Sequence, residues 1–159
     1  MRAKTRALIL AASLLATTAM PVPAAAAPAI DPLSSVPKYI VVNADTGAIM
    51  SIRPAPSRLP RPVTAPTIVN EHICLSLAAV CFYSGAVPWA DQSFWGTPGT
   101  ITGTWPERKG GYSGGYTATF KWTGNTPKKS LKVGPDTGFG FASGGGDPVR
   151  VTGKSVRIH

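Results

Sequence analysis

The chain has 159 residues, and its 16 lysines and arginines against 7 aspartates and glutamates give a formal net charge of +9. This length allows one domain with appendages and excludes a large α/β enzyme with a separate cofactor domain. The chain contains 17 glycines and 16 prolines, and hydrophobic residues still make up 43% of it, which is enough for a buried core.

The N-terminus has the pattern of an export signal. Residues 1–26 combine basic residues at the start with an apolar stretch over 7–19 and small residues at 24–26. We therefore predict a signal peptide that is cleaved after Ala26, and a secreted product that could associate with the cell wall. The alanine-rich signal is typical of a bacterial protein. No later stretch is long and apolar enough to predict a transmembrane helix.

A proline-rich segment is predicted over residues 27–66. Within it, two β-type runs flank a turn that ends in glycine, which predicts a hairpin over 38–52. A lone hairpin is marginally stable in water. It must therefore pack on the main domain, pair with a partner, or form only transiently. The basic, proline-rich residues 53–62 predict an extended linker.

The remaining residues, 67–159, predict an all-β domain. Apolar and polar residues alternate with period two over 100–105 and 116–122, which is the pattern of half-buried strands. Further short strands are expected at 67–73, 80–83, 130–133, 138–142, 149–151 and 155–158. The predicted fold is a small, compact sandwich or barrel.

Cys74 and Cys81 are the two cysteines of the chain. In an exported chain an even pair predicts a disulfide, and six intervening residues fit neither a redox motif nor half of a zinc site. The sequence predicts no metal and no cofactor.

The cysteine region also carries a family resemblance. Cys74 followed by Val80-Cys81-Phe82-Tyr83 resembles the opening of secreted bacterial βγ-crystallin-like domains, some of which are protease inhibitors of actinomycetes. Ser155-Val156-Arg157-Ile158 is similar to the strand that closes such a domain. The acidic or asparagine pair that precedes this strand in the family is replaced by Arg150 and Val151. The resemblance therefore implies a fold class and leaves calcium binding open.

Aromatic residues define the candidate binding surface. Several of them fall in a loop bounded by Pro and Gly, or flank a glycine-rich turn, where they are either core or contact residues. Exposed aromatic residues in loops commonly stack on sugars or anchor protein partners. Two neighbouring basic residues would form a charged rim. The candidate binding residues are Trp89, Phe94, Trp95, Arg108, Lys109, Tyr112 and Tyr116.

These features predict a secreted, non-enzymatic β domain that binds an extracellular protein or a cell-envelope polymer, with an inhibitor as one form. The basic excess would attract anionic polymers, whereas export makes nucleic acid an unexpected partner. Two alternatives remain open. The hairpin could mediate assembly of an envelope-associated structure, or Asp91 and Glu107 could form the carboxylate pair of a small hydrolase.

Overall fold

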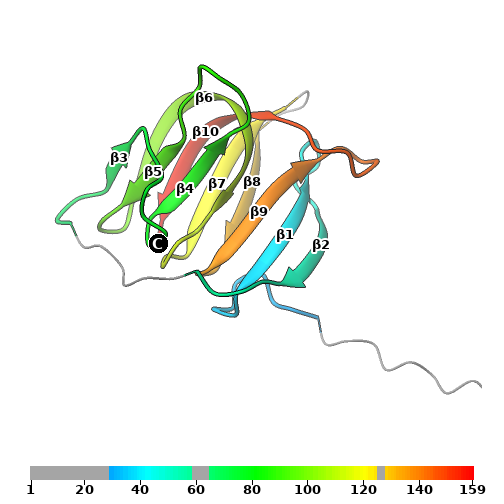
Figure 1. The fold of residues 1–159 in the computed structure, drawn as a ribbon, viewed down its shortest axis with the longest axis horizontal. Coiled ribbons are helices and arrows are strands. Elements are labelled where there is room, and N and C mark those ends of the chain that lie inside the picture. Colours follow the sequence, from blue (N-terminus) through cyan, green and yellow to red (C-terminus); the bar gives the residue numbers. More distant parts are fainter. Residues whose placement is uncertain (1–28, 59–64, 125–127) are drawn as a thin grey trace, which may run out of the picture.

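A computed structural model describes residues 29–58, 65–124 and 128–159. Every regular element within these ranges is a β-strand, which confirms the all-β prediction (Figure 1). The predicted signal peptide and residues 59–64, which include part of the predicted linker, lie outside the described residues. The strands are β1 Lys38–Asn43, β2 Ile49–Pro54, β3 Val69–Glu71, β4 Val80–Ser84, β5 Gln92–Trp95, β6 Gly99–Tyr112, β7 Ala118–Thr123, β8 Lys129–Val133, β9 Thr137–Ala142 and β10 Val151–Ile158.

The strands form a single sheet that curls into a half-barrel (Figure 1). The long strand β6 joins its two halves. Its C-terminal part pairs with β4 and β9, and the strand order of that half is β2-β1-β9-β6-β4-β5-β3. Most of β6 also pairs with β10, which continues the sheet through β7 to β8. The two halves therefore face each other across a shared core.

The bend in β6 lies at a bulge. Trp105 pairs with Gly153 and Arg108 with Val151, so Pro106 and Glu107 together oppose one residue of β10. A bulge suits proline, because the unpaired position needs no backbone donor, and Glu107 adopts a φ of 59° there. The bulge lets the strand continue past Glu107 to Tyr112.

The predicted hairpin is part of the main sheet. β1 pairs in parallel with β9, and Ile40 and Val42 lie fully buried in the core. Of the three alternatives that the sequence leaves open, the structure shows the first: the hairpin packs on the domain and is not isolated. The extended linker starts two residues later than predicted, because Arg53 and Pro54 belong to β2.

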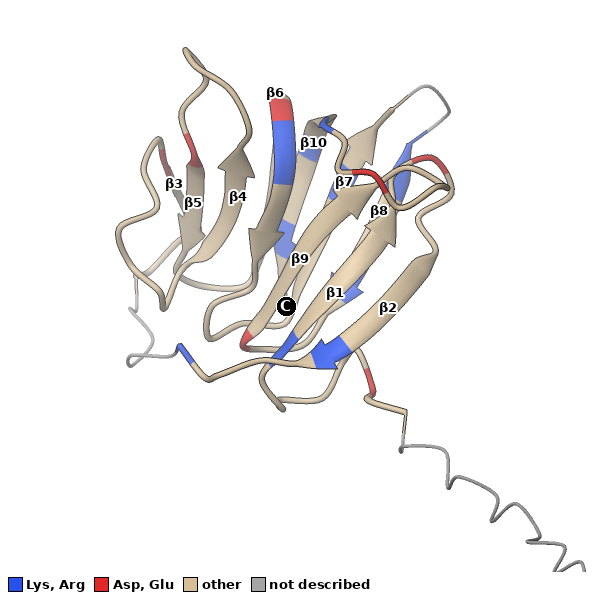
Figure 2. Ribbon diagram, turned by 45° about the vertical axis from the view of Figure 1, so that its right-hand side comes forward, with Lys and Arg blue, Asp and Glu red and all other residues tan. Residues whose placement is uncertain are grey.

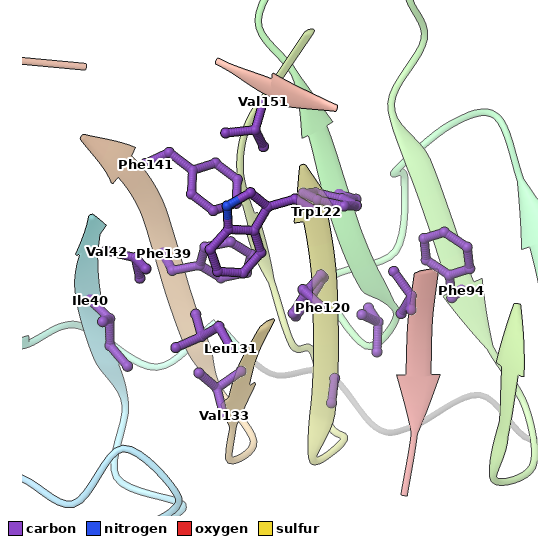
Figure 3. Close-up of a cluster of buried hydrophobic side chains, with 14 of the residues drawn as sticks. Ile40, Val42, Phe94, Phe120, Trp122, Leu131, Val133, Phe139, Phe141 and Val151 are labelled. Atoms are coloured by element: carbon purple, nitrogen blue, oxygen red, sulfur yellow. The ribbon is translucent and has the colours of Figure 1, made fainter. Parts of the chain in front are cut away.

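The core is rich in aromatic residues from both halves of the sheet (Figure 3). The Trp122 ring on β7 packs against Phe141 on β9, with 4.7 Å between ring centroids. Its Nε1–H donates a hydrogen bond of 2.8 Å to the carbonyl oxygen of Ala44, just after β1. Phe82 contacts Phe120 edge to face at 5.3 Å. These contacts connect strands that are far apart in the chain.

The sequence predicts that Phe94 and Trp95 lie in a loop, and the structure corrects this prediction. Both residues belong to β5, which pairs with β3 and β4. The strand is too short for alternation to be recognised, since only Phe94 faces the core. The predicted disulfide is present between Cys74, which follows β3, and Cys81 in β4, with 5.9 Å between Cα atoms.

Candidate functional site

The sequence-predicted contact residues do not form one surface. Phe94 is a fully buried core residue. Tyr116 packs partly against the core, and its hydroxyl accepts a hydrogen bond of 3.3 Å from the Gly96 N–H. Trp95 lines a small hollow of about 210 Å³ beside the disulfide loop. Trp89 is exposed, in the loop between β4 and β5. Whether Trp89 and Trp95 bind a partner stays a prediction.

Arg108 is buried and binds main-chain carbonyl groups around it. It does not form the charged rim that the sequence predicts. Its side chain is 1% exposed. Its Nη1 donates to the carbonyl oxygens of Phe82 and Ala90, and its Nε donates to that of Pro106, each at 2.9 Å. Burial lowers the pKa of this guanidinium. The contacts hold the ends of the β4–β5 loop, which carries Val87 and Trp89 at the surface.

A hollow of the described part of the chain lies on the outer face of the sheet, opposite the core. Phe139 and Phe141 of β9 point into the core, so Gly138 and Gly140, which alternate with them, face outward. Gly110 of β6 pairs with Gly140 and lines the same hollow. All three of these residues lack a side chain. The result is a groove of about 420 Å³ with a floor of backbone.

Tyrosines form the walls of this groove. Tyr39 on β1 pairs with Gly138 and lies over the glycine floor, because a Cβ at Gly140 would collide with its hydroxyl. The Arg53 guanidinium lies over the Tyr39 ring, 4.9 Å from its centroid. Tyr83 on β4 and Tyr112 on β6 line the groove as well. The groove therefore offers aromatic surface above a bare sheet.

One end of the groove is closed by the segment that follows β2. The Ser57 hydroxyl donates a hydrogen bond of 2.6 Å to Oδ2 of Asp136, and the Arg58 N–H donates one of 3.4 Å to Oδ1. The Tyr112 hydroxyl also donates to Oδ1 of Asp136. Three donors thus occupy this carboxylate. The contacts bring the Arg58 side chain to the groove lining.

Basic residues flank the groove. Figure 2 shows Lys and Arg on β1, β2 and β6 and in the segment that follows β2. Lys109, exposed beside the β6 bulge, and Arg58 both belong to the lining and have no ion pair in the described ranges. The Lys38 ammonium, also in the lining, is instead turned to the carbonyl oxygens of Ser34 and Val36, the latter at 2.9 Å. Burial lowers the pKa of Lys38.

Ionisation of Tyr112 lowers the stability of the fold at alkaline pH. Burial and the hydrogen bond to Asp136 raise the pKa of this hydroxyl above its ordinary value of 10.0. In the unfolded chain Tyr112 ionises near that value while the folded chain keeps its proton, so the free energy of unfolding falls as pH rises above about 10. We expect Tyr112→Phe to make this alkaline fall shallower. Urea unfolding of both proteins between about pH 7 and 11 measures it; parallel pH profiles would contradict it.

The proposed hydrolase residues have other contacts. Oδ1 of Asp91 accepts a hydrogen bond of 2.6 Å from the Ser84 N–H, which places it at the base of the β4–β5 loop. Oε2 of Glu107 forms an ion pair of 3.2 Å with Arg150. Neither residue lines the groove. Within the described ranges there is no cluster of three metal-binding side chains and no helix long and apolar enough to cross a membrane.

Sequence reasoning missed Tyr39, Tyr83 and Arg58. The sequence pattern that indicates the groove lies in a different segment, at Gly138-Phe139-Gly140-Phe141. Glycine at every second position predicts one bare face on a strand whose other face is core. No protein-family model, curated protein or solved structure matches this chain. The resemblance to βγ-crystallin-like domains therefore stays a prediction.

Proposed function

We propose that this chain is an exported, non-enzymatic binding domain, and that the outer groove holds its target, an extracellular protein or a cell-envelope polymer. The observation that carries the proposal is the glycine floor between Tyr39 and Tyr83. A volume of about 420 Å³ accommodates a ring-sized group. Tyrosine walls supply apolar contact and hydrogen bonding together, which is the chemistry of many recognition sites.

The construction of the groove supports binding more than catalysis. Its floor is main chain that the sheet holds rigidly, through the pairing of β9 with β1 on one side and β6 on the other. Its carboxylate, on Asp136, already accepts three hydrogen bonds. A surface that the sheet already holds rigid loses little conformational entropy when it binds.

A retention experiment tests the proposal. The immobilised domain is exposed to the cell-envelope polymers and the secreted proteins of the organism that encodes it. We expect wild-type retention to be lost in Tyr83→Ala/Lys109→Ala, since both residues line the groove. Val87→Ala/Trp89→Ala is the matched control at the exposed β4–β5 loop and should retain the target.

Two results of this experiment would contradict the proposal. The first is no retention by the wild-type domain from either fraction. The second is retention that survives in the groove variant and disappears in the loop variant, which would place the binding site at Trp89. Thermal unfolding of each variant shows that a loss of binding is not a loss of fold.

A second candidate function, assembly through the hairpin, is favoured by the exposed side chains of β2. This strand lies at the sheet edge with β1 as its partner in the described part of the chain, and Ile49 and Met50 are exposed on it. Such an edge can pair with another chain. A deletion of residues 27–66 would remove the hairpin, but it would also remove the buried strand β1 and so disturb the fold. Met50→Lys leaves β1 in place and is therefore the better test. A mass in solution equal to one chain for the wild type would reject assembly.

A further inference from the structure

We infer that the ligand of the outer groove is an acidic sugar ring, a pyranose that carries a carboxylate or a phosphate, presented by an anionic polysaccharide of the cell envelope. This inference rests on the proposed function and specifies its target. Charge, hydrogen-bonding groups and the position of the groove on the sheet support it independently.

The charge of the lining favours an anion. Lys109 and Arg58 reach the groove without an ion pair in the described ranges. Asp136 is the one acidic residue of the lining, and its oxygens are occupied by Tyr112, Ser57 and the Arg58 N–H. A ligand in the groove therefore lies near two cationic side chains that form no ion pair with a carboxylate in the described ranges. This positive charge complements a carboxylate or a phosphate on the ligand.

The walls suit a sugar ring. Within the described residues, the hydroxyls of Tyr39 and Tyr83 have no hydrogen-bond partner in the protein, so they remain available to ligand hydroxyls. Burial raises the pKa of Tyr83, which keeps that hydroxyl protonated as a donor. The apolar C–H face of a pyranose can pack on aromatic surface while its hydroxyls lie at the periphery. The groove combines these two kinds of contact.

The position of the groove disfavours an acidic peptide. Extended peptides commonly bind by adding a strand to a sheet edge, where main-chain groups are unpaired. The floor strands β6 and β9 are interior strands, and their main-chain groups pair within the sheet. A peptide on this face would leave its own main-chain groups largely unpaired. A sugar needs only the side chains that line the groove.

Calorimetric titration with defined probes tests the inference. The probes are a galacturonate oligomer, a mannose 6-phosphate oligomer, a neutral glucan of matched length and an oligoglutamate peptide. We expect binding of one or both acidic saccharides, and the two arms distinguish carboxylate from phosphate. Lys109→Ala and Arg58→Ala should each weaken binding about tenfold. Lys132→Ala, which removes the same charge at an exposed position of β8, should not.

The inference is overturned if neither acidic saccharide binds, if the neutral glucan binds equally well, if oligoglutamate competes for the groove, or if Lys109→Ala and Lys132→Ala behave alike. Failure of the proposed function is a different result. If envelope retention depends on Tyr83 and Lys109 but the acidic saccharides neither bind nor compete, the groove is the binding site and only its ligand class is wrong.

Discussion

Trp122→Ala is expected to lower the free energy of unfolding by about 3–5 kcal/mol, the range for a large aromatic side chain removed from a core. The indole is completely buried and packs on Phe141 at 4.7 Å. Its removal also takes the N–H donor from the Ala44 carbonyl. Because Trp122 is on β7 and Ala44 follows β1, the substitution weakens the contact between the two halves of the sheet.

Urea unfolding followed by circular dichroism measures this effect, and two variants divide it. Trp122→Phe keeps an aromatic ring but not the donor, so we expect a smaller loss than for alanine, with about 0.5–1.5 kcal/mol from the hydrogen bond. Trp89→Ala changes an exposed tryptophan and should stay within about 0.5 kcal/mol of wild type. Equal losses for Trp122→Ala and Trp89→Ala would contradict the placement of Trp122 in the core.

Arg108→Met is expected to destabilise the domain by about 2–4 kcal/mol, although methionine is apolar and replaces the unbranched aliphatic part of the arginine side chain. The substitution removes the donors from the carbonyl oxygens of Phe82, Ala90 and Pro106. A buried polar group without a partner costs about 1–3 kcal/mol, and groups that stay close to water cost less. The β4–β5 loop should also become more mobile, because Arg108 holds its ends.

Two comparisons make the Arg108 result specific. Arg108→Lys retains the charge but lacks the forked guanidinium, so we expect it to restore only part of the lost stability. Arg157→Met removes an arginine that is exposed on β10 and should have little effect. Amide hydrogen exchange over residues 85–91 reports on the loop. Full stability of Arg108→Lys, or of Arg108→Met, would show that the three carbonyl contacts do not support the fold.

Local patterns predict the strands whose two faces have different surroundings. β7 alternates between core and surface, so the period-two pattern alone predicts that Phe120 and Trp122 are buried. The parallel pairing of β1 with β9 cannot be predicted in this way, because it joins segments far apart in the chain and depends on packing. The disulfide is predictable, since the chain has two cysteines and one pairing.

The candidate site is less predictable than the fold because its floor is formed by glycines, which have no side chain to recognise in the sequence. Among the seven predicted contact residues, only Lys109 and Tyr112 line the groove. Arg108 and Lys109 are neighbours with opposite environments, because successive side chains of a strand point to opposite faces, and here Arg108 is buried and Lys109 exposed. The order of basic and aromatic residues in the sequence does not show which of them is buried and which is exposed. Tyr39 and Tyr83 line the same groove only because β1 and β4 belong to the same sheet.

The most direct test of the groove as the binding site is a map of backbone amide chemical shifts during titration with the envelope or secreted fraction that the domain retains. The floor glycines Gly110, Gly138 and Gly140 report there without side chains of their own. We predict that these amides and those of Tyr39 and Tyr83 shift together and saturate. Shifts confined to the β4–β5 loop or the disulfide loop, with the floor glycines unchanged, would contradict the assignment of the groove.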